Sequence, residues 1–119
     1  MTKILDIQQS IEAANGNVSL AKELFTMLLD DLNQRLRQIE SSFKAGNMES
    51  LTEHIHKLYG ATAYCIVPKL RYKTSILEEK LKKNNFSQVD ELVVDVINEI
   101  QNIINAGPEY IKENWLDYK

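Results

Sequence analysis

The sequence predicts an all-α chain that folds as an antiparallel up-down-up-down four-helix bundle with a short extra helix at each terminus. Two observations support this fold class: apolar residues recur every three or four positions along several segments, and only two prolines and four glycines interrupt the 119 residues. The breaks between the segments are short, which favours antiparallel neighbours. We interpret residues 1–119 as one domain: a first helix in 1–16, the four-helix bundle in 17–106 and a helical tail in 107–119.

Composition excludes several classes of protein. The net charge is −3 and no basic cluster occurs, so the chain does not have the charge pattern of a nucleic-acid binder. The opening residues lack the apolar core of a signal peptide, and no run approaches the roughly 20 apolar residues of a membrane span. We therefore expect a cytoplasmic location. Cys65, the single cysteine, lies on an apolar stripe, which predicts a buried and inert thiol.

The first two helices are predicted from their ends and their stripes. Residues 4–14 form a short helix that Asn15 and Gly16 terminate. A long helix then begins at residue 17 or 19 and runs to about Ala45, where Gly46 stops it. Its apolar stripe contains Ala21, Leu24, Phe25, Leu28, Leu32, Leu36, Ile39 and Phe43.

Two apolar residues, Leu20 and Met27, lie off this stripe. We expect the first helix to cover Leu20. For Met27 two interpretations stay open: the first helix covers it, or it belongs to an exposed apolar patch where a partner docks, because methionine adapts to varied surfaces. Both residues are candidates for a docking surface.

A third helix is predicted from Asn47, its cap, to Ile66 or Val67, with Glu49 and Glu53 near its positive end. One face carries the apolar residues Met48, Leu51, Ile55, Leu58, Thr62, Cys65 and Ile66. These side chains should pack against the rest of the bundle.

His56 does not belong to that apolar face. At about 100° per residue it points roughly 130° from the centre of the stripe, whereas His54 lies only about 70° from it. Gly60 follows one turn later on the side of His56, and it costs a helix about 1 kcal/mol relative to alanine. Together with Ala63, two turns on, Gly60 would leave room for a bulky group to reach the ring from solvent.

The fourth helix is predicted to start at Pro68, because the residue before a proline avoids the helical conformation and proline suits a first turn. Its buried seam contains Leu70, Thr74, Leu77 and Leu81. Its basic residues, which we interpret mainly as a solvated face, are Lys69, Arg71, Lys73, Lys80, Lys82 and Lys83.

The fifth helix is the most apolar of the chain, so it should lie deepest. Ser87, followed by acidic residues, is predicted to open it, and Gly107 and Pro108 are predicted to end it after Ala106. The tail in 109–119 can add one or two turns with frayed ends. Its apolar residues, expected to fold onto the bundle, are Ile111, Trp115 and Leu116.

Within an all-helical chain of this size, His56, Leu58, Gly60 and Ala61 resemble the histidine phosphotransfer (HPt) domain, in which a surface histidine is followed four residues on by glycine and then by small residues. The string HKLYGATAYCIVPKL, with LDIQQSIEAANGN and AKELFTMLLDDL before it, is most similar to the C-terminal HPt domain of BarA-type hybrid sensor kinases. The similarity covers most of residues 4–105. One position departs from the pattern: many family members carry a lysine where this chain has Tyr59, although Lys57 is a nearby cation.

The resemblance implies a phosphorelay intermediate of two-component signalling. His56 would accept a phosphoryl group from the phosphoaspartate of a receiver domain and pass it to an aspartate of a response regulator. The receiver would supply Mg²⁺, so the domain itself would bind no cofactor and would have no kinase activity of its own. An exposed neutral imidazole keeps a lone pair on one nitrogen and can act as a nucleophile without a dedicated base.

The site residues divide into two groups around the phosphoacceptor His56. Those expected near the phosphate are Glu53, Lys57, Gly60 and Ala63, and those expected to contact a partner are Leu20, Met27, Thr52 and Tyr59. As an isolated domain the chain is expected to be a monomer. The resemblance also implies a fragment of a larger kinase whose parent chain sits in the inner membrane, and a free-standing protein stays open as the alternative.

Two other functions fit parts of the sequence. Glu53 and His56 have the i, i+3 spacing of di-iron bundles, but such a site needs a second Glu-x-x-His pair and the only other histidine is His54. We therefore expect no metal. A bundle that only holds a partner in place is the third hypothesis, since this fold serves many functions. A reactive ring framed by Gly60 and Ala63 distinguishes the phosphotransfer hypothesis from that one.

Overall fold

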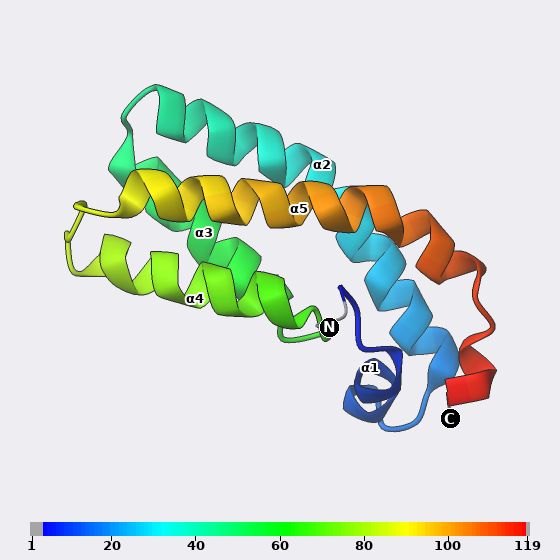
Figure 1. Cartoon of the computed structure of the whole chain (residues 1–119). Coiled ribbons are helices and arrows are strands. Elements are labelled where there is room, and N and C mark those ends of the chain that lie inside the picture. Colours follow the sequence, from blue (N-terminus) through cyan, green and yellow to red (C-terminus); the bar gives the residue numbers. More distant parts are fainter. Residues whose placement is uncertain (1–3, 119) are drawn as a thin grey trace.

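The computed structural model describes residues 4–118 and confirms the all-α fold class, with no strand among those residues. The elements are α1 (Ile7–Ala13), α2 (Val18–Lys44), α3 (Met48–Ala61), α4 (Pro68–Lys82), α5 (Val89–Lys112) and the short 3₁₀ helix η1 (Trp115–Tyr118). The helices α2 to α5 form the bundle, in which α2 and α4 each pack against both α3 and α5. The short α1 lies at one end and packs against α2 and η1 (Figure 1).

Local signals begin α2, α3 and α4, and end α2, as predicted. The side chains of Asn17 and Asn47 accept hydrogen bonds from the backbone N–H groups of Leu20 and Ser50, at 2.9 and 3.0 Å, and so cap α2 and α3. Gly46 turns the chain between them with a φ of 69°, and Pro68 is the first residue of α4.

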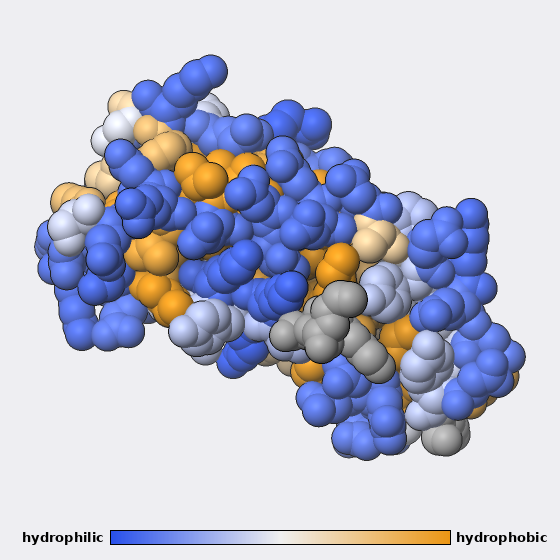
Figure 2. All heavy atoms as spheres, in the orientation of Figure 1, coloured by the Kyte–Doolittle hydropathy of each residue, from blue (hydrophilic) through white to orange (hydrophobic). Residues whose placement is uncertain are grey.

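The predicted apolar stripes line a single core that includes Phe25, Leu32, Ile55, Leu77 and Ile100, each 0% exposed. Figure 2 shows hydrophilic residues over most of the outer surface on the face in view, as amphipathic helices require. Cys65 is buried, and burial raises the pKa of its thiol to about 11, which agrees with an inert thiol.

The prediction that the third helix reaches Ile66 or Val67 is wrong, because α3 ends at Ala61. The backbone of Ile66 bonds instead to the N-terminal segment: its N–H donates to Ser10 Oγ at 3.1 Å, and its C=O accepts from the N–H of Asp6 at 2.8 Å. These contacts hold residues 62–67 as a turn in which Thr62, Cys65 and Val67 are buried. Ala63 therefore lies beyond the helix.

The expected end of the fifth helix is also wrong, since α5 continues through Gly107 and Pro108 to Lys112. Gly107 is buried against α2, where a Cβ would lie 2.5 Å from a methyl carbon of Leu29. Glycine thus permits a close crossing of the two helices. Packing against α2 offsets the one helical hydrogen bond that the missing N–H of Pro108 removes.

Two smaller expectations at the ends of α5 are corrected. Ser87 does not cap the helix: its hydroxyl donates to Asn85 Oδ1 at 2.9 Å, and Gln88 occupies the cap position without a side-chain bond. In the tail Trp115 is buried as predicted, with its ring centroid 6.1 Å from that of Phe25. Leu116, however, is 65% exposed and does not fold onto the bundle.

Candidate functional site

His56 projects from the outer face of α3, and 63% of its side chain is exposed. Its Nδ1 lies 2.7 Å from Oε1 of Glu78, a buried residue of α4. A carboxylate only accepts hydrogen bonds, so Nδ1 carries the proton of this bond. In the neutral ring the lone pair is then on Nε2, the nitrogen that Glu78 does not engage.

Glu78 is held ionised by its surroundings. The Nζ of Lys82 lies 2.6 Å from the same oxygen, Oε1, that His56 contacts. Burial raises the pKa of the Glu78 carboxyl, but hydrogen bonds from Lys82 and His56, with the charge of Lys82, outweigh burial and leave this pKa below its ordinary value. Glu78 therefore acts as a fixed negative charge at the Nδ1 side of the His56 ring.

No motif or spacing in the sequence directly indicates that Glu78 belongs to the site. It lies 22 positions from His56, and only the packing of α4 on α3 brings the two together. A weak signal exists, since Glu78 is a carboxylate between the seam residues Leu77 and Leu81 and is therefore directed partly toward the bundle.

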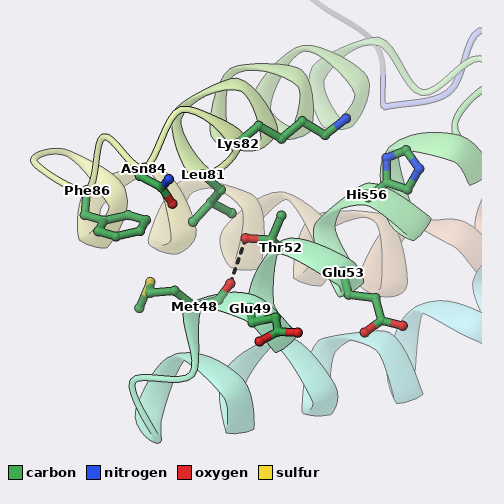
Figure 3. Close-up of a pocket in the computed structure, with 9 residues that line it drawn as sticks. All are labelled: Met48, Glu49, Thr52, Glu53, His56, Leu81, Lys82, Asn84 and Phe86. Atoms are coloured by element: carbon green, nitrogen blue, oxygen red, sulfur yellow. Dashed lines mark hydrogen bonds between the residues drawn. The ribbon is translucent and has the colours of Figure 1, made fainter.

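The residues predicted near the phosphate behave differently from one another. Gly60 faces open space, because a Cβ built there meets nothing within 4 Å. Glu53 and Lys57 form an exposed ion pair along α3, with Nζ and Oε1 3.4 Å apart, and the Glu53 side chain points away from the ring (Figure 3). Ala63 is exposed in the turn after α3. The ring partner is thus Glu78, and Glu53 does not orient His56.

A hollow of about 550 Å³ lies beside His56, between α3, the end of α4 and the turn that leads to α5. Figure 3 shows Met48, Leu81 and Phe86 at the end remote from the histidine, with Thr52 between. The hydroxyl of Thr52 donates to the backbone oxygen of Met48 at 2.7 Å. Thr52 is therefore the predicted docking residue that opens onto this hollow.

The other three docking candidates lie elsewhere. Met27 is 58% exposed on α2, and Leu20 is 39% exposed, so α1 does not cover Leu20 as expected. Neither lines the hollow. Tyr59 lies one turn after His56 and packs against Arg71 of α4.

Within residues 4–118, no group of three or more histidine, cysteine, aspartate or glutamate side chains is arranged to hold a metal ion. In the same part of the chain, none of the helices has the length and apolar character that crossing a membrane requires.

The structure thus places an exposed histidine on a bundle helix, with one ring nitrogen bonded to a carboxylate of the next helix. The sequence pattern of the Hpt domain matches residues 23–106, and the chain belongs to this family. It is 34% identical over 93 residues to the sensor histidine kinase GacS of Pseudomonas protegens, and this alignment covers 76% of this chain and 10% of that kinase. It is 28% identical over 108 residues to the signal transduction histidine-protein kinase BarA of Escherichia coli, and this alignment covers 90% of this chain and 12% of the kinase. The chain thus spans about a tenth of the length of these relatives.

Solved structures support the same assignment. The HPT domain of a hybrid histidine kinase from Shewanella superposes with a TM-score of 0.85 at 25% identity, covering 91% of this chain and 93% of that one. The phosphotransfer protein HptB of Pseudomonas aeruginosa has the same fold, with a TM-score of 0.76 at 17% identity over 94% of this chain and 97% of that one.

Proposed function

We propose that this domain is a phosphorelay intermediate of two-component signalling, in which His56 accepts a phosphoryl group from a receiver-domain phosphoaspartate and passes it to an aspartate of a response regulator. Membership of the Hpt family and the similarity to hybrid kinases support the relay role. The observation that carries the assignment to His56 is its exposed ring, bonded through Nδ1 to the buried Glu78.

The transfer needs no proton movement within this domain. The Nε2 lone pair attacks phosphorus, the bond from phosphorus to the aspartyl oxygen breaks, and the aspartate leaves as a carboxylate. The phosphorylated ring keeps its Nδ1 proton and gains positive charge, which the ionised Glu78 at 2.7 Å stabilises. In the return step the lone pair goes back to Nε2, so a neutral imidazole is the leaving group.

The partner completes the site. The domain offers a nucleophile and a fixed carboxylate, and we expect the receiver to supply the phosphoaspartate, Mg²⁺ and further cations. Thr52 and Tyr59 on α3 flank His56 and are the candidates for direct contact, whereas Leu20 and Met27 on α2 would extend the contact surface. In this proposal the chain works at the cytoplasmic end of a sensor kinase and is itself without kinase activity.

The direct test is phosphotransfer from purified, phosphorylated receivers to this domain. We expect one acid-labile phosphate per chain, on Nε2 of His56, because Glu78 occupies Nδ1. The two phosphohistidine isomers are distinguished by ³¹P NMR. Phosphate on another residue, or on Nδ1, would contradict the assignment.

Substitutions at Gly60 separate stability from transfer. Gly60→Ala will stabilise α3 by up to about 1 kcal/mol, since the Cβ meets open space, the backbone has no positive φ and alanine has the higher helix propensity. Gly60→Leu will keep most of that stability but slow transfer several-fold, because the larger side chain occupies the approach to the ring. Thermal unfolding and single-turnover transfer measure the two effects. Equal transfer rates in wild type and Gly60→Leu would show that transfer does not need the open space at Gly60.

A further inference from the structure

Arg71, in the first turn of α4, reaches across to α3 and is held there by three contacts. Its guanidinium carbon lies 4.5 Å from the centre of the Tyr59 ring. One terminal nitrogen donates to Thr62 Oγ1 at 3.0 Å, and the other donates to the Tyr59 hydroxyl at 3.2 Å. The guanidinium is therefore fixed in position although the residue is exposed.

None of these contacts neutralises the charge. Within residues 4–118 no carboxylate forms an ion pair with Arg71, whereas Lys57, Lys73 and Lys82 each have one. A guanidinium has five N–H donors, and the contacts to Thr62 and Tyr59 use two of them. The remaining donors suit the oxygen atoms of a phosphoryl group, which arginine binds in a bidentate manner.

The position of Arg71 relative to His56 follows from the helices. Tyr59 comes three residues after His56, and both side chains contact α4, so they leave α3 on the same side. Figure 3 shows one ring nitrogen of His56 on the side of Lys82 and the other on the far side of the ring. Glu78 engages Nδ1, so Nε2 is the nitrogen left for a phosphoryl group, and the stacking of Arg71 on Tyr59 places the guanidinium one turn along α3 from His56.

We propose that Arg71, positioned by Tyr59 and Thr62, binds the phosphoryl group while His56 carries it. This inference rests on the proposed function and deepens it, because it assigns the cation that this chain itself contributes. Tyr59 has no charge of its own, and its role is to hold the arginine. Glu78 stabilises the ring from one side, and Arg71 neutralises the phosphate on the other.

One experiment compares variants of equal charge. Arg71→Gln will slow transfer from a phosphorylated receiver about tenfold relative to Lys69→Gln, which removes the same charge two residues earlier on α4. Arg71→Lys will recover part of the rate, and Tyr59→Leu, which removes the stacking surface, will slow transfer more than Tyr59→Phe. Circular dichroism checks that each variant is folded. Equal rates in Arg71→Gln and Lys69→Gln would overturn the proposal.

A second experiment does not depend on a receiver. Potassium phosphoramidate phosphorylates exposed histidines directly, so the side-chain N–H signals of Arg71 can be followed by NMR as His56 is modified. We expect these signals to shift in wild type and to stay unchanged in His56→Gln. Unmoved signals in the phosphorylated wild type would overturn the proposal. They would do so even if Arg71→Gln slows transfer, because Arg71 would then act only by binding the receiver. If no receiver phosphorylates the domain but phosphoramidate still shifts Arg71, the relay function is wrong while the phosphate contact stands.

Discussion

Replacing His56 by glutamine will abolish phosphoryl acceptance and leave the helical content unchanged. Glutamine has no nucleophilic nitrogen, so the transfer step itself is lost. The effect on folding should be small, because the ring is 63% exposed and a glutamine amide can still donate to Glu78. Acid-labile label from a ³²P-phosphorylated receiver measures acceptance, and far-ultraviolet circular dichroism measures helix.

The matched control is the same substitution two residues earlier. His54 is partly buried on α3, with an Nδ1 that has no hydrogen-bond partner within residues 4–118. His54→Gln will change stability through packing while acceptance stays near the wild-type level. Label on the His56 variant, or its loss from the His54 variant, would show that the phosphoacceptor is assigned to the wrong residue.

The parts of the fold that were predicted correctly depend on local signals. Asn17, Asn47 and Pro68 begin their helices through a side-chain cap or a fixed φ, and these effects act within one turn of the residue itself. The apolar stripes likewise need only the helical period. Such features can be read from a sequence without knowledge of the neighbouring elements.

The boundaries that were predicted wrongly depend on contacts between distant residues. The apolar stripe of α3 continues into Cys65 and Ile66, but Ser10 and Asp6 bond to the backbone of Ile66 and fix a turn there. Gly107 reads as a helix end, yet it marks the place where α5 crosses Leu29. In both cases tertiary packing overrides a local preference.

The candidate site, like the fold, was predictable only where local features of the sequence determine it. Periodicity alone placed His56 on the surface, and the family resemblance gave it a role. Glu78 and Arg71 could not be assigned from spacing, because each meets α3 only through the antiparallel register of α4. Spacing placed Glu53 within one turn of the ring, as a residue near the phosphate or an ordinary solvated glutamate, and in the structure it forms an exposed pair with Lys57.

Replacing Glu78 by glutamine will slow transfer roughly 10- to 100-fold, the range expected when the charged acceptor of a hydrogen bond is removed. The amide can still accept from Nδ1, but it no longer offsets the positive charge of the phosphorylated ring, and it no longer neutralises Lys82. The matched control is Glu79→Gln, next along α4, which removes the same charge from an exposed pair with Lys83. Equal transfer rates in the two variants would show that the bond between His56 and Glu78 has no part in the reaction.

Stability against pH tests the charge of Glu78, which Lys82 and His56 together stabilise, without any receiver. The pKa of Glu78 lies below its ordinary value of 4.5 in the folded chain, so the unfolded chain takes up this proton more readily as pH falls. The stabilisation from Glu78 is therefore complete above about pH 5 and is lost as the pH falls through the lowered pKa. The difference in unfolding free energy between wild type and Glu78→Gln should be constant near neutral pH and shrink below pH 4.5. A difference that stays constant throughout, with transfer still slowed, would mean that Glu78 orients the ring by shape alone and that its charge does not contribute.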